Sequence, residues 1–300
     1  MTVAQTLGYR ILSRNEAAKD SPPSDALSVA SSGGQQAPGA QSAALREPLV
    51  LLRGLGRSSR FWLGFEEKLR AAGDVVMVDL KGTGMSPSRI GRWTVADHAR
   101  DVLETLKATG YERFHLVSIS FGAMVAIELA GLLGKSCSSA TFVSSSARFT
   151  GERRINPAAL VGFAKSLRSS IPRNADFARY IVSEGYLKSH PELPKVWDAL
   201  YRTEGFSRLA TLGQLTAAAT FDGRAALEAL EIPTFFVVSR DDGLVSWRNS
   251  VVMSQAAKQS SLHVYEGPGH DLPTEIPDDL SARVIAFCCA AEQRSGGGGG

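Results

Sequence analysis

A serine, an aspartate and a histidine, in that order, could act together in nucleophilic catalysis. Ser120 follows an apolar run at residues 114–119 that predicts a buried strand, and residues 121–133 have the composition and spacing of a helix. Small residues, Ser118 and Gly122, stand two positions before and after it. A serine in such a tight turn is held above the sheet, beside helix N–H groups that favour a developing oxyanion.

A serine nucleophile needs a base that takes its proton and an acid that orients the base. Asp241 and Asp242 follow a run at residues 232–239 that predicts another buried strand, and His270 follows a shorter predicted strand. The carboxyl ends of parallel strands meet at one edge of a sheet, where open α/β sheets place their sites. The sequence therefore predicts a site that joins Ser120, one of these aspartates and His270.

The elements that must position these residues alternate along the first part of the chain. Thr94, with Asp97 three residues later, is a plausible N-terminal cap for one of the predicted helices. Alternation of strand and helix predicts a parallel sheet with helices on both faces. The expected strands are residues 9–12, 49–52, 75–79, 114–119 and 140–143, and the expected helices are 59–72, 95–109 and 121–133.

The alternation stops after the fifth of these strands. Residues 148–223 predict several helices, with breaks at Pro157, Pro172, Pro191 and Pro194. Strands then return before Asp242 and His270, and a long helix is expected over residues 277–291.

With these motifs in this order, the chain resembles the α/β-hydrolase superfamily, in particular its small capped serine hydrolases of the esterase, lactonase and thioesterase type. The resemblance covers about residues 48–292. It rests on five segments in register: residues 49–56, residues 79–86, the turn at Ser120, the loop at Asp242 and the loop at Gly269–His270.

The resemblance implies an α/β-hydrolase fold: a mostly parallel, twisted sheet with helices on both faces and a helical cap insertion. The expected core is residues 48–147 and 224–292, and the cap is residues 148–223. Residues 1–47 are expected to be a largely flexible N-terminal segment, rich in Ser, Ala, Gly, Gln and Pro from about residue 21 to 44. Residues 293–300 are expected to be a disordered tail.

The resemblance also implies site residues. The family spacing Asp-x-x-Val favours Asp242 as the acid, with Asp241 as the alternative, beside Ser120 as nucleophile and His270 as base. The oxyanion hole is expected at the backbone N–H groups of Leu55 and Phe121.

Arg53 stands where the family usually has a histidine that braces the oxyanion loop. An arginine donates hydrogen bonds but cannot accept them. The loop must therefore be braced differently, or Arg53 reaches the pocket and binds an anionic group. Trp62 could wall the same pocket or lie in the first buried turn of its helix. Cap aromatics could line an acyl pocket or attach the cap to the core: Phe149, Phe163, Phe177, Tyr180, Tyr186, Trp197, Tyr201 and Phe206.

The expected activity is hydrolysis of an ester-type bond, in a carboxylic ester, lactone or thioester, through an acyl-enzyme on Ser120. The same triad serves C–C bond hydrolases and acyltransferases, which remain alternatives. The family pattern usually has other residues at three positions, Ser118, Ser239 and Arg53. A ligand-binding protein without catalytic activity therefore remains a further alternative.

Composition sets further expectations. A net charge of +3 is too small to argue for nucleic-acid binding. The sequence has no run of 18 apolar residues, so no membrane span is expected. Three cysteines, two of them adjacent, do not suit a disulfide framework and fit a cytoplasmic protein, and the N-terminus lacks a signal pattern. No metal-ligand spacing or phosphate-binding loop is present, so we expect no metal or cofactor and a small acyl compound as the partner.

Overall fold

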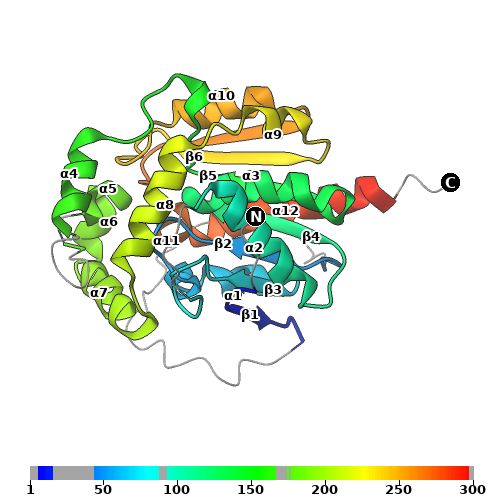
Figure 1. Cartoon of the computed structure of the whole chain (residues 1–300), viewed down its shortest axis with the longest axis horizontal. Helices are drawn as coiled ribbons and strands as arrows, with labels where there is room; N and C mark the ends of the chain where they lie inside the picture. The colour runs from blue at the N-terminus through cyan, green and yellow to red at the C-terminus, as the bar shows by residue number, and fades with distance from the viewer. Residues whose placement is uncertain (1–5, 16–43, 88–92, 167–173, 176, 297–300) are drawn as a thin grey trace.

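The computed structural model describes residues 6–15, 44–87, 93–166, 174–175 and 177–296 (Figure 1). Within them, seven strands form one sheet in the order β1-β3-β2-β4-β5-β6-β7. β1 pairs antiparallel with β3, and every other neighbouring pair is parallel. The strands are β1 Tyr9–Leu12, β2 Leu49–Leu52, β3 Val75–Val78, β4 Phe114–Ile119, β5 Cys137–Val143, β6 Thr234–Ser239 and β7 Ser260–Tyr265.

The inner strands are buried along their whole length. In β2, β4 and β5 every residue is buried, which explains why β2 is a continuous apolar run rather than an alternating one. Helices cover both faces of the sheet, as Figure 1 shows. The expected fold class is therefore confirmed.

Two apolar clusters join the helices to the two faces. One cluster joins α2 (Val95–Lys107), α3 (Phe121–Leu133), α9 (Arg224–Ala229) and α10 (Arg248–Ala256) to the sheet. The other joins α1 (Phe65–Arg70) and α12 (Pro277–Gly296) to the opposite face. Thr94 caps α2 as its spacing predicted: its hydroxyl accepts from the Asp97 N–H, and the Asp97 carboxylate accepts from the Thr94 N–H.

Several expected elements differ in extent from the structure: β5 begins three residues before the expected residue 140, and β3 and α2 end one and two residues early. The helix expected over residues 59–72 is a 3₁₀ turn, η1 (Ser59–Trp62), followed by the separate helix α1. The break has a local cause, because Leu63 and Gly64 have φ of 53° and 93°, which a right-handed helix does not tolerate. At the C-terminus α12 continues to Gly296, so the expected tail is helical over residues 293–296, and residues 297–300 lie outside the described residues.

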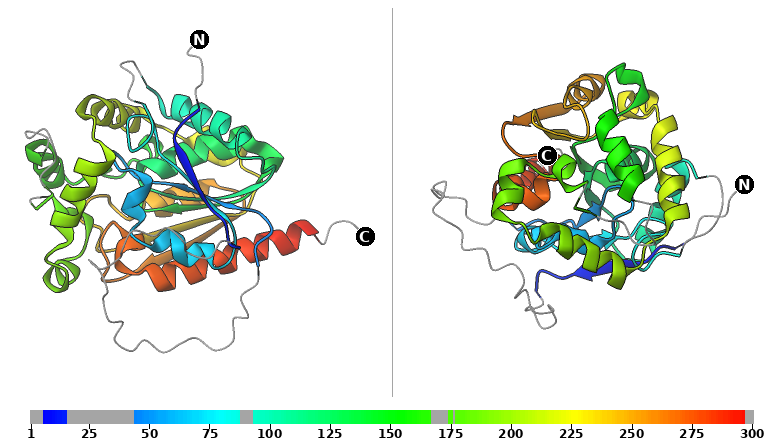
Figure 2. Two further views of the ribbon diagram at one scale, coloured as in Figure 1. Left: turned by 90° about the horizontal axis from the view of Figure 1, so that it is seen from below. Right: turned by 90° about the vertical axis from the view of Figure 1, so that its left-hand side faces the viewer.

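A group of helices is inserted between β5 and β6. Figure 1 shows it at the left of the sheet, and the right-hand view of Figure 2 looks directly onto it. The bounds of 148–223 expected for this cap remain a proposal. Pro172 and most of the expected flexible N-terminal segment lie outside the described residues. The helices are α4 (Pro157–Ser166), α5 (Ala178–Ile181), α6 (Glu184–Ser189), α7 (Leu193–Glu204) and α8 (Arg208–Thr220), after the 3₁₀ turn η3 (Arg148–Thr150).

None of the described helices combines the length and the hydropathy that crossing a membrane requires.

Candidate active site

Ser120 occupies a strained turn between β4 and α3. Its φ of 57° and ψ of −118° are rarely adopted by a residue with a side chain. Hydrogen bonds hold this conformation: the Ser120 N–H donates to the Val143 carbonyl at 2.9 Å, and the Ser145 hydroxyl donates to the Ser120 carbonyl at 3.0 Å. The strand-to-helix junction expected from the sequence thus becomes a sharp turn with Ser120 at its apex.

The two small neighbours of Ser120 are both used by the turn. A Cβ atom on Gly122 would lie 2.3 Å from the carbonyl oxygen of Leu52, so only glycine lets α3 approach the end of β2 this closely. Ser118 is tolerated where a glycine is usual, because its hydroxyl donates to the Thr141 carbonyl on β5 at 2.9 Å.

His270 is joined to Asp242. The His270 Nδ1 lies 2.8 Å from the Asp242 Oδ2, and the two side chains are 5% and 0% exposed. The other carboxylate oxygen, Oδ1, accepts from the backbone N–H groups of Leu244 and Val245 at 2.9 and 2.8 Å. Three hydrogen bonds therefore fix the Asp242 carboxylate in the orientation that holds the imidazole.

Asp241 faces elsewhere. It is exposed, and its carboxylate accepts from the Gly267 N–H at 2.6 Å. Ser239, the other departure in this loop, donates to the Pro268 carbonyl and accepts from the Asp241 N–H at 3.1 Å. Of the two aspartates that the sequence left open, the structure brings only Asp242 to His270, while Ser239 and Asp241 tie the two loops together.

Leu55 and Phe121 flank Ser120. Phe121 is the first residue of α3, so its N–H has no acceptor within the helix. The loop that contains Leu55 also approaches Ser120, because a Cβ atom on the neighbouring Gly54 would lie 3.3 Å from the Ser120 Cβ.

Gln214, which the sequence did not indicate, clamps the same loop from α8. It is fully buried, and its Oε1 accepts from the Gly56 N–H at 2.8 Å, while its Nε2 donates to the Lys81 carbonyl at 3.1 Å. A cap helix therefore helps to position the expected oxyanion loop. Only the position of Gln214 in the folded chain reveals this, since nothing in its local sequence does.

Arg53 is buried and pairs with Asp271. Its Nη1 and Nη2 donate to the two Asp271 oxygens at 3.0 and 2.8 Å, and its guanidinium lies 4.8 Å from the centre of the Trp62 ring. Burial alone would raise the pKa of the Asp271 carboxyl, but Arg53 and Arg57 outweigh it and hold the pKa at about 2. Arg53 is thus tied to the neighbour of His270, which is a brace unlike the family's histidine.

Arg57 is a second cation on the same carboxylate. Its Nη1 donates to the Asp271 Oδ2 at 2.7 Å, and its guanidinium lies 4.2 Å from the centre of the Trp197 ring on α7. Neither Arg57 nor Asp271 was expected from the sequence. The available signal was their charge: a basic residue in the expected oxyanion loop and an acidic one directly after His270.

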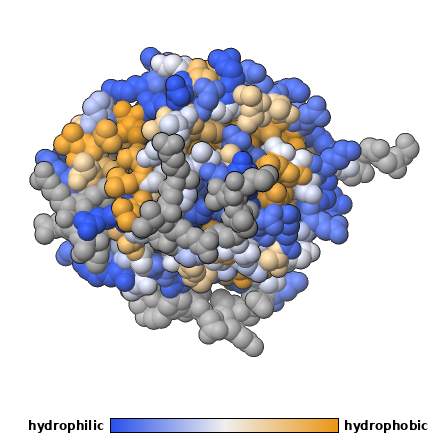
Figure 3. All heavy atoms as spheres, viewed as in Figure 1, coloured by the Kyte–Doolittle hydropathy of each residue, from blue (hydrophilic) through white to orange (hydrophobic). Residues whose placement is uncertain are grey.

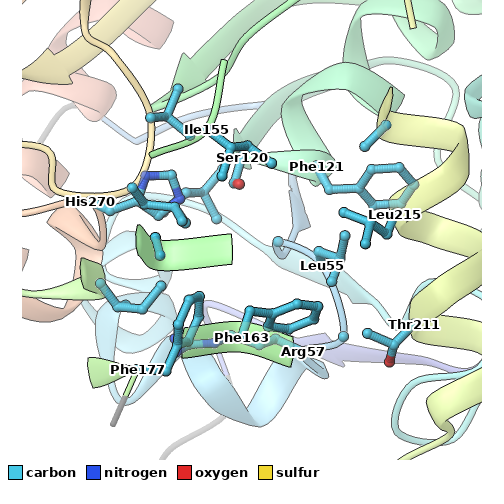
Figure 4. A pocket seen from close by; sticks show the side chains of 18 of the residues that line it. Leu55, Arg57, Ser120, Phe121, Ile155, Phe163, Phe177, Thr211, Leu215 and His270 are labelled. Atoms are coloured by element: carbon cyan, nitrogen blue, oxygen red, sulfur yellow. The ribbon is translucent and has the colours of Figure 1, made fainter. Parts of the chain in front are cut away.

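A cavity of about 340 Å³ lies between the cap and the edge of the sheet. Ser120, Phe121, Leu55 and His270 all line it, as Figure 4 shows. Arg53 contributes to its wall as well. Among the expected cap aromatics, those that line it are Phe163, Phe177, Tyr201 and Phe206.

Trp62 is not among the described residues of this wall. Its side chain is 1% exposed and packs with Phe65 in the core below Arg53, at 5.7 Å between ring centres. Of the two positions expected for Trp62, the structure has the buried turn and not the pocket wall, because the short turn η1 directs the indole into the core. Trp197 is likewise fully buried in the cap.

The cavity reaches the surface beside α4. Leu160 both lines it and is 45% exposed, and it belongs to a set of exposed apolar residues on α4 and α8. The hydrophobic areas that Figure 3 shows on the cap side agree with an apolar approach to the cavity. The other members of this set are Val161, Leu209 and Leu212.

One group of residues could hold a metal ion by composition. Glu47, His115 and Glu292 bring ligand-type atoms within 4.8 Å of one another in the described part of the chain. They lie at the start of β4, at the end of the sheet opposite Ser120, and their carboxylates already pair with Arg113 and Arg46. These ion pairs account for the cluster as a structural link between α12 and the sheet.

Comparisons with known proteins agree with this geometry. A family model described as the alpha/beta hydrolase fold matches residues 47–275. A candidate carbamate hydrolase, RutD of Azorhizobium caulinodans, is 26% identical over 253 residues, which is 80% of this chain and 91% of that protein.

Solved structures share the fold. The enol-lactonase of Burkholderia xenovorans superposes with a TM-score of 0.73 at 16% identity, over 94% of this chain and 96% of that one. The esterase RhEst1 of a Rhodococcus species superposes with a TM-score of 0.70 at 20% identity, over 84% of this chain and 92% of that one. Because the family model spans most of the chain, this protein belongs to the alpha/beta hydrolase fold family.

Proposed function

We propose that this protein is a serine hydrolase that cleaves an ester-type bond of a small acyl substrate through an acyl-enzyme on Ser120. The observation that carries the proposal is the buried, oriented pair of His270 and Asp242, whose His270 lines the same cavity as the strained Ser120. Strain and buried charged groups are both costly, and they gather at working sites.

In the proposed reaction His270 takes the proton of the Ser120 hydroxyl as its oxygen attacks the substrate carbonyl. Asp242 accepts a hydrogen bond from the Nδ1–H, which directs the Nε2 to the serine and stabilises the imidazolium. The N–H groups of Phe121 and Leu55 hold the tetrahedral oxyanion. His270 then gives its proton to the leaving alcohol or thiol. In the second step His270 takes a proton from water, which attacks the acyl-enzyme, and returns that proton to the Ser120 oxygen as the acid leaves.

The names of three similar proteins, a carbamate hydrolase, an esterase and an enol-lactonase, support attack on an acyl carbonyl. The same triad could also cleave a C–C bond or pass the acyl group to another acceptor. Ester hydrolysis is the proposal because it needs only the residues described here and water.

Two measurements test this proposal. The first is turnover of p-nitrophenyl esters from acetate to decanoate, with a p-nitrophenyl carbamate in the same panel. Ser120→Ala and His270→Ala should reduce kcat by several powers of ten, and their effects should not add because the residues act as a unit. Ser189→Ala and His263→Ala, outside the cavity wall, are the matched controls and should keep wild-type rates.

The second measurement separates the nucleophile from the substrate. A fluorophosphonate ester should react once per chain, with the Ser120 oxygen displacing fluoride at phosphorus, and peptide mass spectrometry should find the adduct on Ser120. Labelling without turnover of the panel would keep the nucleophile and reject the ester class. Absence of both labelling and turnover would reject the serine hydrolase and favour a binding protein.

A further inference from the structure

The charged side chains of the cavity wall are out of balance. Among the described lining residues Arg53, Arg57 and Arg154 are cations, whereas Asp271 is the one carboxylate. Burying an uncompensated charge is costly, and proteins normally supply a partner for it. Among the residues that the structure describes, this wall therefore carries more positive than negative charge.

Two of these arginines are already engaged by this chain. Arg53 uses both terminal nitrogens on Asp271. Arg154 donates to the carbonyls of Ala218 and Ala219 at the end of α8, at 2.6 and 3.0 Å. Arg57 donates the fewest hydrogen bonds of the three within the described residues, because only one of the five N–H groups of its guanidinium is used, on Asp271.

The surroundings of Arg57 resemble a binding site for a planar anion. Its guanidinium is 5.2 Å from the centre of the Phe61 ring and 4.2 Å from that of Trp197, so aromatic rings fix its plane. The Tyr201 side chain interacts electrostatically with Arg57 and also lines the cavity. Burial lowers the pKa of Arg57, an effect that Asp271 partly offsets, which is the state of a cation that one more anion would stabilise.

We infer that Arg57 and Tyr201 form a subsite for a carboxylate carried by the substrate, in addition to the carbonyl that Ser120 attacks. Arg57 and Ser120 both line the cavity drawn in Figure 4, so the subsite belongs to the same cavity as the serine. The substrate class is a small ester with an apolar body and a second, anionic end. The cleavage of such an ester rests on the proposed function, whereas binding of its carboxylate at Arg57 does not.

The kinetic test compares monomethyl adipate with dimethyl adipate, which differ only in the free carboxylate. Wild type should prefer the monoester in kcat/KM. Arg57→Met should reduce that preference about 10- to 100-fold, the range for one lost hydrogen bond to a charged group. Tyr201→Phe should reduce it less, and Arg57→Lys should restore part of it.

Matched variants keep the comparison specific. Arg60→Met removes a half-exposed arginine from the same turn and should leave the preference unchanged. Arg57→Met leaves Asp271 paired with Arg53, so we expect it to fold, which circular dichroism checks. If Arg154→Met removes the preference and Arg57→Met does not, the assignment to Arg57 is wrong.

A binding measurement makes failure of this inference distinct from failure of the proposed function. Calorimetry with Ser120→Ala should show tighter binding of the monoester than of the diester, and loss of that difference in Ser120→Ala/Arg57→Met. No turnover with an Arg57-dependent binding preference rejects the hydrolase and keeps the subsite. Equal binding of both esters rejects the subsite, whatever the turnover.

Discussion

The guanidinium of Arg53 and the carboxylate of Asp271 form a buried ion pair with two hydrogen bonds, between residues 218 positions apart. One partner precedes the expected oxyanion loop, and the other directly follows His270. The pair therefore links the two loops that must keep their spacing around Ser120, and it does so with an arginine that the family pattern does not have.

Removing either partner should destabilise the fold unequally. Asp271→Asn leaves two buried guanidiniums without a carboxylate, whereas Arg53→Met leaves Asp271 paired with Arg57. We expect Asp271→Asn to lower the free energy of unfolding by about 3–5 kcal/mol and Arg53→Met by less. Urea unfolding at pH 7 measures both. Equal losses would mean that Arg57 does not share the charge of Asp271.

The effect of Asp271 should depend on pH. Its folded pKa of about 2 lies below the unfolded value of about 3.9, so the unfolded chain binds the proton first as the pH falls. The stabilisation is present above about pH 4 and is lost as the pH falls towards 2. The difference in unfolding free energy between wild type and Asp271→Asn should be constant from pH 7 to 5 and should shrink below pH 4.

Substitution of Asp242 should lower kcat far more than substitution of Asp241. Asp242→Asn removes the acceptor that holds the His270 tautomer and should lower kcat by about three to four powers of ten, by analogy with other serine triads. Asp241→Asn, an exposed neighbour, should stay within about threefold of wild type. Esterase assays on both variants test the assignment, and the reverse ranking would transfer the acid role to Asp241.

Gln214 should affect the reaction through the oxyanion loop. Gln214→Leu removes the acceptor of the Gly56 N–H and the donor to the Lys81 carbonyl, so the loop loses its tie to α8. We expect kcat to fall about tenfold, with KM changed much less, because the loop acts on the transition state. Thr216→Ala, exposed on the same helix, is the control. A change confined to KM would instead indicate a role in substrate binding.

His98 should make the fold less stable in mild acid. It lies fully buried against the ring of Phe121, and neither ring nitrogen has a hydrogen-bond partner among the described residues. Burial, with a smaller contribution from Lys81, lowers its pKa to about 3. Below about pH 6.5 this histidine binds a proton in the unfolded chain but not in the folded protein. The free energy of unfolding therefore decreases as the pH is lowered.

His98→Leu should therefore flatten the dependence of the unfolding free energy on pH by about 1.4 kcal/mol per pH unit between pH 6 and 4. Denaturant titrations at several pH values measure the slope. An unchanged slope would show that His98 is protonated in the folded protein.

The sequence by itself determined the fold and the chain order of the candidate site. The apolar runs before Ser120 and Asp242 could be interpreted locally, because a strand buried on both faces favours apolar side chains at most positions. The turn at Ser120 was equally local, since Gly122 is required by the close approach of α3 to β2.

The tertiary structure decided what depends on distant partners. It brought Asp242 rather than Asp241 to His270, placed Trp62 in the core, and joined Arg53 and Arg57 to Asp271. None of these follows from spacing along the chain, because each is set by which loops meet at the end of the sheet. A side chain's charge is visible in the sequence, but its partner is known only after the chain has folded.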